Sequence, residues 1–536
     1  MSRTSSAWLG VVLLTLALHL AYLSQDSRLP ADLGQYYVPL PDLYRALNGE
    51  SWQGVWPALM ERPGAWYNLL TATWLSLVDK SAAAFQMLDL LWFGGLLFIG
   101  SSVGFVLGGE RGRLAAATVL CATPMVVLSA RTSWVHVPEA TLLLAMLRIW
   151  LGDPTLSKRR SVFGLALLGA LCLSLRPSAL PWLATFLGAA LWGVDGKRPS
   201  WKKLVWIVVT WALASIQMLP YIETYLAAKA MARSRYMERV PELLTQLIGA
   251  VGVLGGLASV VGAILGLRKP DGLYALAWVF VLLPLLLTTL SGAGLDNFLP
   301  LAIGLALMAA RNTDRHPWSV GLWALPLLVL VSPQLLTDLP KDGVLHKAFG
   351  LLQTPANPGP NNRLRPFQEL AGDELFSLIE ASCPDPRAPC TLLIDQGLFE
   401  PYGESMGELP LFLTWERRTE LVSLAQGDLP TQINPDAMVH WSCTEEKAEE
   451  ERIWRNRYPQ SGRKAMELSE RFDLRLAWKR DLRGCSLMWL TPGGNVGTPE
   501  QLPFPGPVLD NEHHLLELSV VSESPRDRPR PQVPGR

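Results

Sequence analysis

Long apolar segments separated by short charged loops fill the chain from Trp8 to Leu336, and this pattern constrains the fold more than any other feature. A segment of roughly 20 apolar residues crosses the hydrocarbon layer of a bilayer. Charged residues make up only 18% of the chain, against about 25% in soluble domains. The sequence therefore predicts a polytopic α-helical membrane domain, and it excludes a soluble enzyme, a disordered chain and a fibrous chain.

The pattern predicts about eleven transmembrane helices, several of them shorter than the ~20 residues that a straight span needs. They are residues 8–23, 84–108, 114–130, 135–151, 162–175, 179–194, 204–220, 243–267, 273–290, 298–310 and 320–336. The first segment resembles a signal peptide, but no clear cleavage site follows it, so we interpret it as an uncleaved span.

Segment 66–78 is apolar but short, and its tryptophans and tyrosine suit a helix that lies in the headgroup layer. If this segment does not span and the N-terminus is cytoplasmic, every second loop lies in the cytoplasm. Those loops are short and rich in Arg and Lys, as the positive-inside rule requires; they are 110–113, 153–160, 195–203, 268–271 and 311–316. The odd number of spans then places everything after Leu336 outside the cytoplasm.

Three domains follow from composition: a membrane domain over 1–336, an extracytoplasmic α/β domain over 337–498, and a disordered Pro-rich tail over 499–536. Predicted strands in the α/β domain cover 390–394, 420–424, 437–443, 474–479 and 486–490, and predicted helices cover 444–457 and 463–472. No nucleotide-binding or hydrolase motif is present in it. We interpret it as a cap or an acceptor-binding domain.

Four cysteines lie in this domain: Cys383, Cys390, Cys443 and Cys485. The first two flank a proline-rich turn, and the other two lie at the end and the start of predicted strands. Disulfides persist in oxidising compartments, so an even number of cysteines outside the cytoplasm favours disulfide bonds. Four reduced thiols and, less favoured, a zinc site are the alternatives.

The topology brings charged residues from separate segments to one face of the membrane. Asp32 and Glu61 lie in the first outer loop, and Glu139 lies about one turn into the fourth span. Three arginines fall at the same face, namely Arg62, Arg131 and Arg176. Charged groups at this depth are costly and usually face a cavity or one another. Carboxylates bind divalent metals or accept protons, and arginines bind phosphate, so the set suits a phosphate-bearing lipid substrate.

Taken one at a time, each residue also has a purely structural interpretation. The acids suit helix caps, first-turn helix positions or solvated pairs, and the arginines suit interfacial anchors. His136 is interpreted as a loop or cap residue, and Tyr36 and Tyr37 suit packing at the interface. The functional interpretation therefore depends on all of these residues falling at one face.

Short motifs spread in order over residues 8–311 resemble the C-type integral-membrane glycosyltransferases that use polyprenyl-phosphate sugars. The most similar groups are the bacterial aminoarabinose transferases that act on lipid A and the dolichyl-phosphate-mannose protein mannosyltransferases. The motifs are ADLGQYY (Asp32, Tyr36, Tyr37), ERPGAWYNLL (Glu61, Arg62), GERGR, TPMVVLSARTSWVHVPEATLLLAML (Arg131, Glu139), LSLRPSAL (Arg176) and NFLPLAIGLALMAAR. Arg replaces the common Lys at 62 and 176, Glu replaces the common Asp at 139, and Asp-Leu stands at 32–33 where many members have Asp-Glu.

The resemblance implies a glycosyltransferase, of the hexosyl or pentosyl class, in the bacterial inner membrane. It implies transfer with inversion from a polyprenyl-phosphate sugar, carried on undecaprenyl phosphate in a bacterium, to an extracytoplasmic lipid, glycan or protein. Asp32 is the expected general base, and Glu61 and Glu139 complete the site. Those three acids are also the expected ligands of a divalent ion (Mg²⁺, Mn²⁺ or Zn²⁺), although the departures leave a metal-independent reaction open. Arg62, Arg131 and Arg176 are expected to bind the lipid phosphate, and Tyr36 and Tyr37 to shape the sugar pocket.

Two other functions remain open: a transporter or lipid flippase, and a catalytically inactive scaffold of the same fold. The sequence shows no inverted hydropathy repeat, and its charges gather at one surface, which favours chemistry there. The basic and acidic residues balance, 47 against 47, so no nucleic-acid partner is expected.

Overall fold

The computed structural model describes residues 3–25, 40–49, 52, 55, 59, 64–78, 82–131, 135–193, 197–216, 247, 251–267, 272–291, 299–324, 378, 381–383, 390–394, 419–423, 434–443, 467–482 and 485–494. The chain divides into two units, Met1–Asp32 with Asp42–Asn362, and Leu33–Pro41 with Arg363–Arg536. The first is built from helices and the second contains a β-sheet, and each is described by itself. The predicted domain boundary at residue 336 lies outside the described residues.

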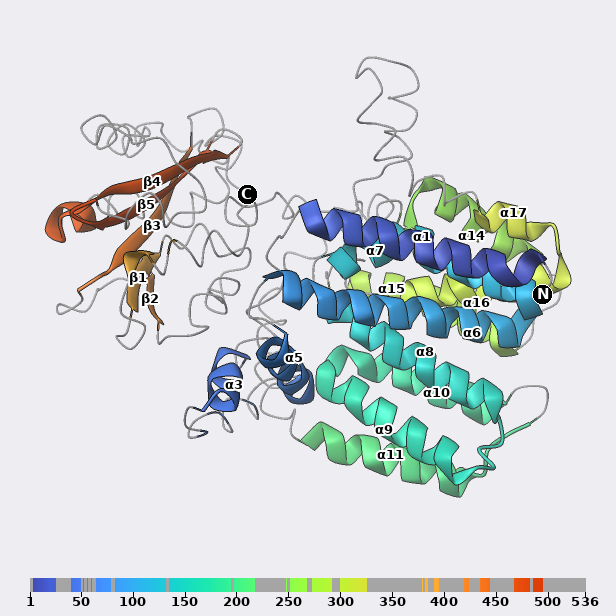
Figure 1. Cartoon of the computed structure of the whole chain (residues 1–536). Helices are drawn as coiled ribbons and strands as arrows, with labels where there is room; N and C mark the ends of the chain where they lie inside the picture. Colours follow the sequence, from blue (N-terminus) through green and yellow to red (C-terminus); the bar gives the residue numbers. More distant parts are fainter. Residues whose placement is uncertain are drawn as a thin grey trace, which may run out of the picture. The chain divides into compact units, whose positions relative to one another are not determined.

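Helices form at all the predicted spans that the structure describes (Figure 1). They are α1 (Arg3–Gln25), α6 (Ala82–Ala122), α7 (Pro124–Arg131), α8 (His136–Gly152), α9 (Arg159–Leu175), α10 (Leu180–Trp192), α11 (Trp201–Ile216), α14 (Val253–Leu267), α15 (Gly272–Ser291), α16 (Pro300–Arg315) and α17 (Ser319–Ala324). Helices α3 (Leu40–Leu47) and α5 (Ala65–Leu77) lie in the first predicted outer loop, and a 3-10 turn, η1 (Pro177–Ala179), joins α9 to α10.

Helix α6 is a tight antiparallel hairpin and not one straight rod. The backbone leaves helical geometry at Gly108 and Gly109, where Gly109 takes a positive φ of 59° that a residue with a side chain rarely adopts. A Cβ atom on Gly104 would lie 2.5 Å from the carbonyl oxygen of Gly112, so the two arms are in backbone contact. The predicted loop 110–113 is therefore helical, because the two glycines make the turn just before it.

Helix α16 is deeply enclosed among the described helices. Its residues from Pro300 to Ala310 are all buried, and it packs against both α6 and α15 (Figure 1). A Cβ on Gly108 of α6 would meet the carbonyl oxygen of Ala310 at 2.4 Å, so α6 and α16 also touch through backbone atoms. The helix continues to Arg315, which corrects the predicted loop 311–316: Asn312 and Thr313 are buried and extend the helix by more than a turn.

The outer surface of the helical unit carries large apolar side chains. Trp206 and Leu213 of α11 are 67% and 63% exposed, and Phe163 of α9 is 68% exposed. Among the described residues, one helical segment, Ala84–Ala122, is long and apolar enough by length and composition to cross a membrane, and three shorter apolar helices accompany it. Exposed apolar surface of this kind suits a hydrocarbon environment.

A compact loop fixes α8 against α9. The Asp153 carboxylate accepts hydrogen bonds from the backbone N–H groups of Ser157 and Lys158, each at 2.9 Å. Burial raises the pKa of Asp153. These backbone hydrogen bonds, together with those from the Ser157 and Ser161 hydroxyls, lower the pKa by more than burial raises it, so it lies well below its ordinary value. The carboxylate stays ionised and holds the loop together through these hydrogen bonds.

The second unit contains a five-stranded mixed sheet of order β2-β1-β3-β5-β4. The strands are β1 (Cys390–Ile394), β2 (Thr419–Ser423), β3 (Ala437–Cys443), β4 (Leu474–Leu482) and β5 (Cys485–Pro492). β1 is parallel to β2 and β3, whereas β5 is antiparallel to β3 and β4. All five match predicted strands within a few residues. A helical segment at 467–471 falls within the predicted helix 463–472, while 444–457 and 499–536 lie outside the described residues.

Cys383 and Cys390 are joined by a disulfide with a Cα–Cα distance of 5.9 Å. This bond ties the segment before β1 to the first residue of that strand. Next to it, the Asp436 carboxylate accepts a hydrogen bond of 2.8 Å from the backbone N–H of Thr391, so the start of β1 is fixed from both sides.

We expect Gly104→Ala to destabilise the protein, because the new methyl group meets backbone atoms of the facing arm. Overpacking of this kind costs about 1–3 kcal/mol. Gly94→Ala in the same helix is the control, since a Cβ there meets nothing within 4 Å and alanine favours a helix. The measurement is thermal unfolding of the purified protein in detergent; equal melting temperatures for the two variants would contradict the hairpin.

We expect Cys443 and Cys485 to form a second disulfide. The sheet register makes them direct partners across β3 and β5. Cys485 also pairs with Leu482 across a two-residue hairpin connection, and residues that flank such a connection exchange backbone hydrogen bonds. The backbone N–H and C=O of Cys485 therefore face β4. Its pair with Cys443 on the β3 side is then the closely spaced, non-hydrogen-bonded type. Such Cα atoms lie about 4.5 Å apart, within disulfide range.

The measurement for this bond is maleimide–polyethylene glycol labelling of the denatured protein, with and without reductant, in a Cys383→Ser/Cys390→Ser background. Labelling of Cys443 and Cys485 only after reduction is the expected result. Full labelling without reductant would show that the two thiols are free.

Candidate functional site

A buried ion pair joins the start of α8 to the end of α9. Arg176 donates from Nη1 to Oε2 of Glu139 at 2.8 Å. The two residues are only 7% and 1% exposed, so each charge needs the other. Glu139 lies in the first turn of α8, and Arg176 caps α9 in an extended conformation that ends the helix before Pro177. The sequence placed both residues at one face, and the structure brings them together.

His136 belongs to the same cluster. Its Nδ1 accepts a hydrogen bond from the Nη1 of Arg176 and lies 4.0 Å from Oε2 of Glu139. The residue is fully buried. The interpretation of His136 as a loop or cap residue is therefore incomplete: it begins α8 as a helical residue, and its ring points into the interior. Its i,i+3 spacing from Glu139, one helical turn, was the available sequence signal.

The two carboxylate oxygens of Glu139 differ in their contacts. Oε2 binds Arg176, whereas Oε1 is buried and has no hydrogen-bond partner within the described part of the chain. Buried carboxylate oxygens are almost always hydrogen-bonded or bound to a cation. Oε1 thus retains the capacity to accept a hydrogen bond or to bind a cation.

Helix α5 is anchored beside this ion pair. The N–H of Gly64, immediately before α5, donates to the carbonyl oxygen of Ser174 at 2.6 Å, two residues before Arg176. Trp66 Nε1 donates to the carbonyl oxygen of Leu171 at 3.1 Å. The start of α5 is therefore fixed to the end of α9, and the predicted Glu61-Arg62-Pro63 motif directly precedes Gly64 in the sequence.

A second buried acid, Asp89, was missed by the sequence analysis. It lies two turns into α6, is 2% exposed, and accepts a hydrogen bond of 3.4 Å from the hydroxyl of Tyr67 in α5. Its position within the apolar run FQMLDLLWF was a clear signal, because an acid inside such a run usually has a function or a partner.

The other predicted site residues are only partly described. Asp32, Tyr36, Tyr37, Glu61 and Arg62 lie outside the described residues. Arg131 is the last residue of α7, and its side chain is not among those described. The carbonyl of its neighbour Ala130 accepts a hydrogen bond from His19 of α1 at 3.3 Å, which fixes the end of α7.

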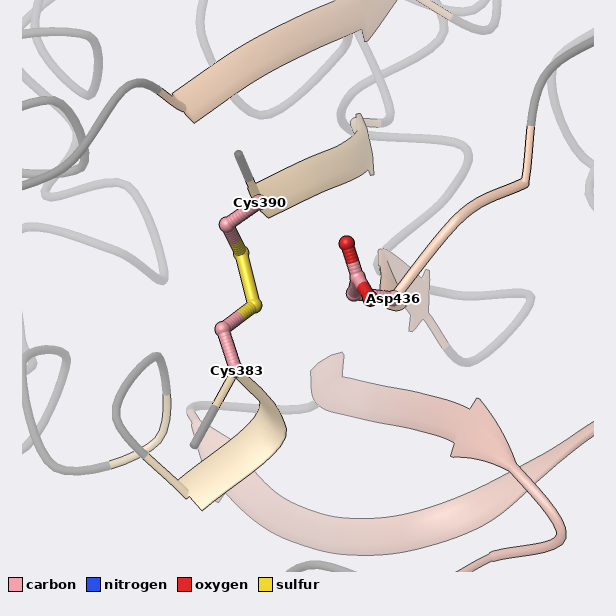
Figure 2. Close-up of side chains that lie close together, drawn as sticks. All are labelled: Cys383, Cys390 and Asp436. Carbon is pink, nitrogen blue, oxygen red and sulfur yellow. A yellow bond between two sulfur atoms is a disulfide. The ribbon is translucent and has the colours of Figure 1, made fainter. Parts of the chain in front are cut away.

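Among the residues that the structure describes, Cys383, Cys390 and Asp436 form another cluster with metal-ligating residue types. Figure 2 shows Cys383, Cys390 and Asp436 close together in the second unit, with potential ligand atoms within 4.8 Å of one another. The two sulfur atoms are bonded to each other, and the aspartate binds a backbone N–H. The cluster therefore stabilises the start of β1, and we assign it no catalytic role.

Comparison with known proteins supports the fold. No protein-family model matches the chain, and no curated protein is similar to it in sequence. Among solved structures, it is similar to ArnT from Cupriavidus metallidurans bound to undecaprenyl phosphate. The identity is 14% and the TM-score is 0.55, and the match covers 92% of this chain and all of that one. The chain thus shares the fold of that structure, a mostly helical polytopic membrane protein.

We expect Arg176→Met to destabilise the protein strongly, because it leaves the Glu139 carboxylate buried without its counter-ion. Breaking a buried pair on one side costs about 3–5 kcal/mol. The double variant Arg176→Met/Glu139→Met removes both charges and should recover part of the loss. Melting temperatures in detergent measure both effects.

The matched control for this pair is Arg475→Met, which removes one partner of the exposed Arg475–Asp473 ion pair and should change stability little. A double variant that is less stable than Arg176→Met alone would contradict the pairing.

Proposed function

We propose that this protein is a membrane glycosyltransferase that transfers a sugar from a polyprenyl-phosphate donor to an acceptor outside the cytoplasm. The donor is a hexose or a pentose on undecaprenyl phosphate, and the acceptor is a cell-envelope lipid, glycan or protein. The protein resides in the bacterial inner membrane with its N-terminus in the cytoplasm and its sheet-containing unit outside.

The buried cluster of Glu139, Arg176 and His136 is the observation that carries this proposal. A charged network in an apolar helical unit is costly and persists where it serves a ligand. Arginine suits the phosphate of a lipid donor, because its planar fork of N–H donors matches phosphate oxygens. The ArnT structure that shares this fold holds undecaprenyl phosphate, which supports the same class of lipid here.

The reaction is a single in-line displacement at the anomeric carbon. Asp32 takes the proton from the acceptor hydroxyl as its oxygen attacks, and the bond from the sugar to the phosphate oxygen breaks with its electrons on that oxygen. The anomeric configuration inverts, and the polyprenyl phosphate leaves. Arg176, together with Arg62 and Arg131, stabilises the negative charge that grows on the leaving phosphate.

The remaining residues shape the site. Glu61 and Glu139 orient the reacting groups, and Tyr36 and Tyr37 line the sugar pocket. A divalent metal ion would bind through Asp32, Glu61 and Glu139 and would supply charge stabilisation. Oε1 of Glu139 suits such a role, because it is the oxygen that Arg176 does not use.

We expect Asp32→Asn to slow transfer by at least about 10²–10⁴-fold, the usual contribution of a general base, without loss of expression. The assay measures release of undecaprenyl phosphate from a panel of undecaprenyl-phosphate hexoses and pentoses, with protein in nanodiscs and an envelope extract as the acceptor. Asp473→Asn is the control, since that carboxylate is exposed on the second unit.

A normal rate for Asp32→Asn would reject the role of Asp32. If the wild-type protein released no undecaprenyl phosphate from any donor, the glycosyltransferase would be rejected. Movement of intact donor lipid across a vesicle bilayer without sugar transfer would identify a flippase instead.

A further inference from the structure

Two acceptors converge on one nitrogen of Arg176. Nη1 contacts both Oε2 of Glu139 and Nδ1 of His136. The acceptors come from one helix face, since His136 and Glu139 are one turn apart in α8. The arginine comes from the end of α9, so the contact also joins two helices. All three side chains are buried, and the geometry of the cluster is fixed by packing as well as by hydrogen bonds.

The chemistry of arginine determines the tautomer of His136. A guanidinium group has only N–H donors and stays protonated in proteins. Nδ1 of His136 must therefore be the acceptor, which requires a neutral imidazole with its proton on Nε2. An imidazolium would direct an N–H group and a positive charge at the guanidinium. His136 contributes a lone pair, and no charge, to this cluster.

A neutral acceptor is not needed to balance the charge of Arg176, because Glu139 already does so. What a second acceptor adds is direction. A guanidinium held by one carboxylate oxygen can still rotate about that contact, whereas a second acceptor at the same nitrogen restricts the orientation of its plane. Recognition of phosphate by arginine depends on that plane, because the N–H donors must point at the oxygens.

We propose that His136 is the positioning residue that orients the Arg176 guanidinium toward the phosphate of the lipid donor. This inference rests on the proposed function and assigns a role to a residue that the mechanism above does not use. The charge on the phosphate grows as the sugar leaves, so an oriented guanidinium acts mainly in the transition state. Loss of the orientation therefore lowers kcat more than it changes KM.

The experiment compares His136→Ala, His136→Asn and His136→Gln in the donor-cleavage assay. An asparagine oxygen occupies nearly the position of Nδ1 and can accept from Arg176, whereas the glutamine amide matches the more distant Nε2. We expect kcat to fall about 10- to 100-fold in His136→Ala, the effect of one hydrogen bond to a charged group. We expect His136→Asn to remain within a few-fold of the wild type, and His136→Gln to resemble the alanine variant.

The comparison of kcat between His136→Asn and His136→Gln separates this role from a structural one. His136→Asn and His136→Gln carry similar polar groups into the same buried place, so a merely structural histidine would give them similar kcat values. His316→Ala, at the far end of α16, is the control for loss of a histidine from the helical unit. A wild-type protein with activity, and an asparagine variant as slow as the alanine variant, would overturn the inference while leaving the glycosyltransferase standing. A wild-type protein without activity would overturn both.

Discussion

A charged arginine inside an apolar helical unit must have a partner, and this requirement organises the site. Arg176 meets Glu139 across the α8–α9 interface, and both are almost completely buried. Neither charge is tolerable alone in such surroundings, so the pair fixes which ends of α8 and α9 meet. The start of α5 is then attached to the same end of α9 through Gly64 and Trp66. The polar residues of this region thus share one rigid frame.

Small residues hold that frame in place. The two arms of α6 touch at Gly104 and Gly112, and the turn of this hairpin contacts α16 at Ala310. Contacts between backbones leave little freedom for the helices to slide, because any shift would bring side chains into the gap. Helix α8 packs against α6 and α9. The position of its first turn, which carries His136 and Glu139, is therefore fixed by the same packing. Catalytic groups need such support, since errors of about 1 Å are costly.

Much of the fold was predictable because hydropathy reports helices directly, whereas the way helices meet depends on individual side chains. Helices form in the described parts of the predicted spans, and all five predicted strands correspond to observed strands. The turn of the α6 hairpin was predicted a few residues too late, because the charged GERGR stretch has the composition of a loop, whereas Gly108 and Gly109 make the turn.

The pairing of Glu139 with Arg176 was predictable in outline, as both interrupt apolar runs. Asp89 gave the same signal and was missed, and His136 gave only a weak one, because a histidine at the start of a helix also suits a cap. The positions of Asp32, Glu61 and Arg62 lie outside the described residues, so their convergence remains a prediction.

The short Asp153 loop has a consequence for the order of assembly. It joins α8 directly to α9, so the ion pair at their other ends is internal to one helical hairpin. Only 37 residues separate Glu139 from Arg176, and no third helix is needed for the two charges to meet. The buried charges of Glu139 and Arg176 can therefore neutralise each other within this hairpin, before α10 and the later helices are made. Both partners of the ion pair are present as soon as α9 has been synthesised.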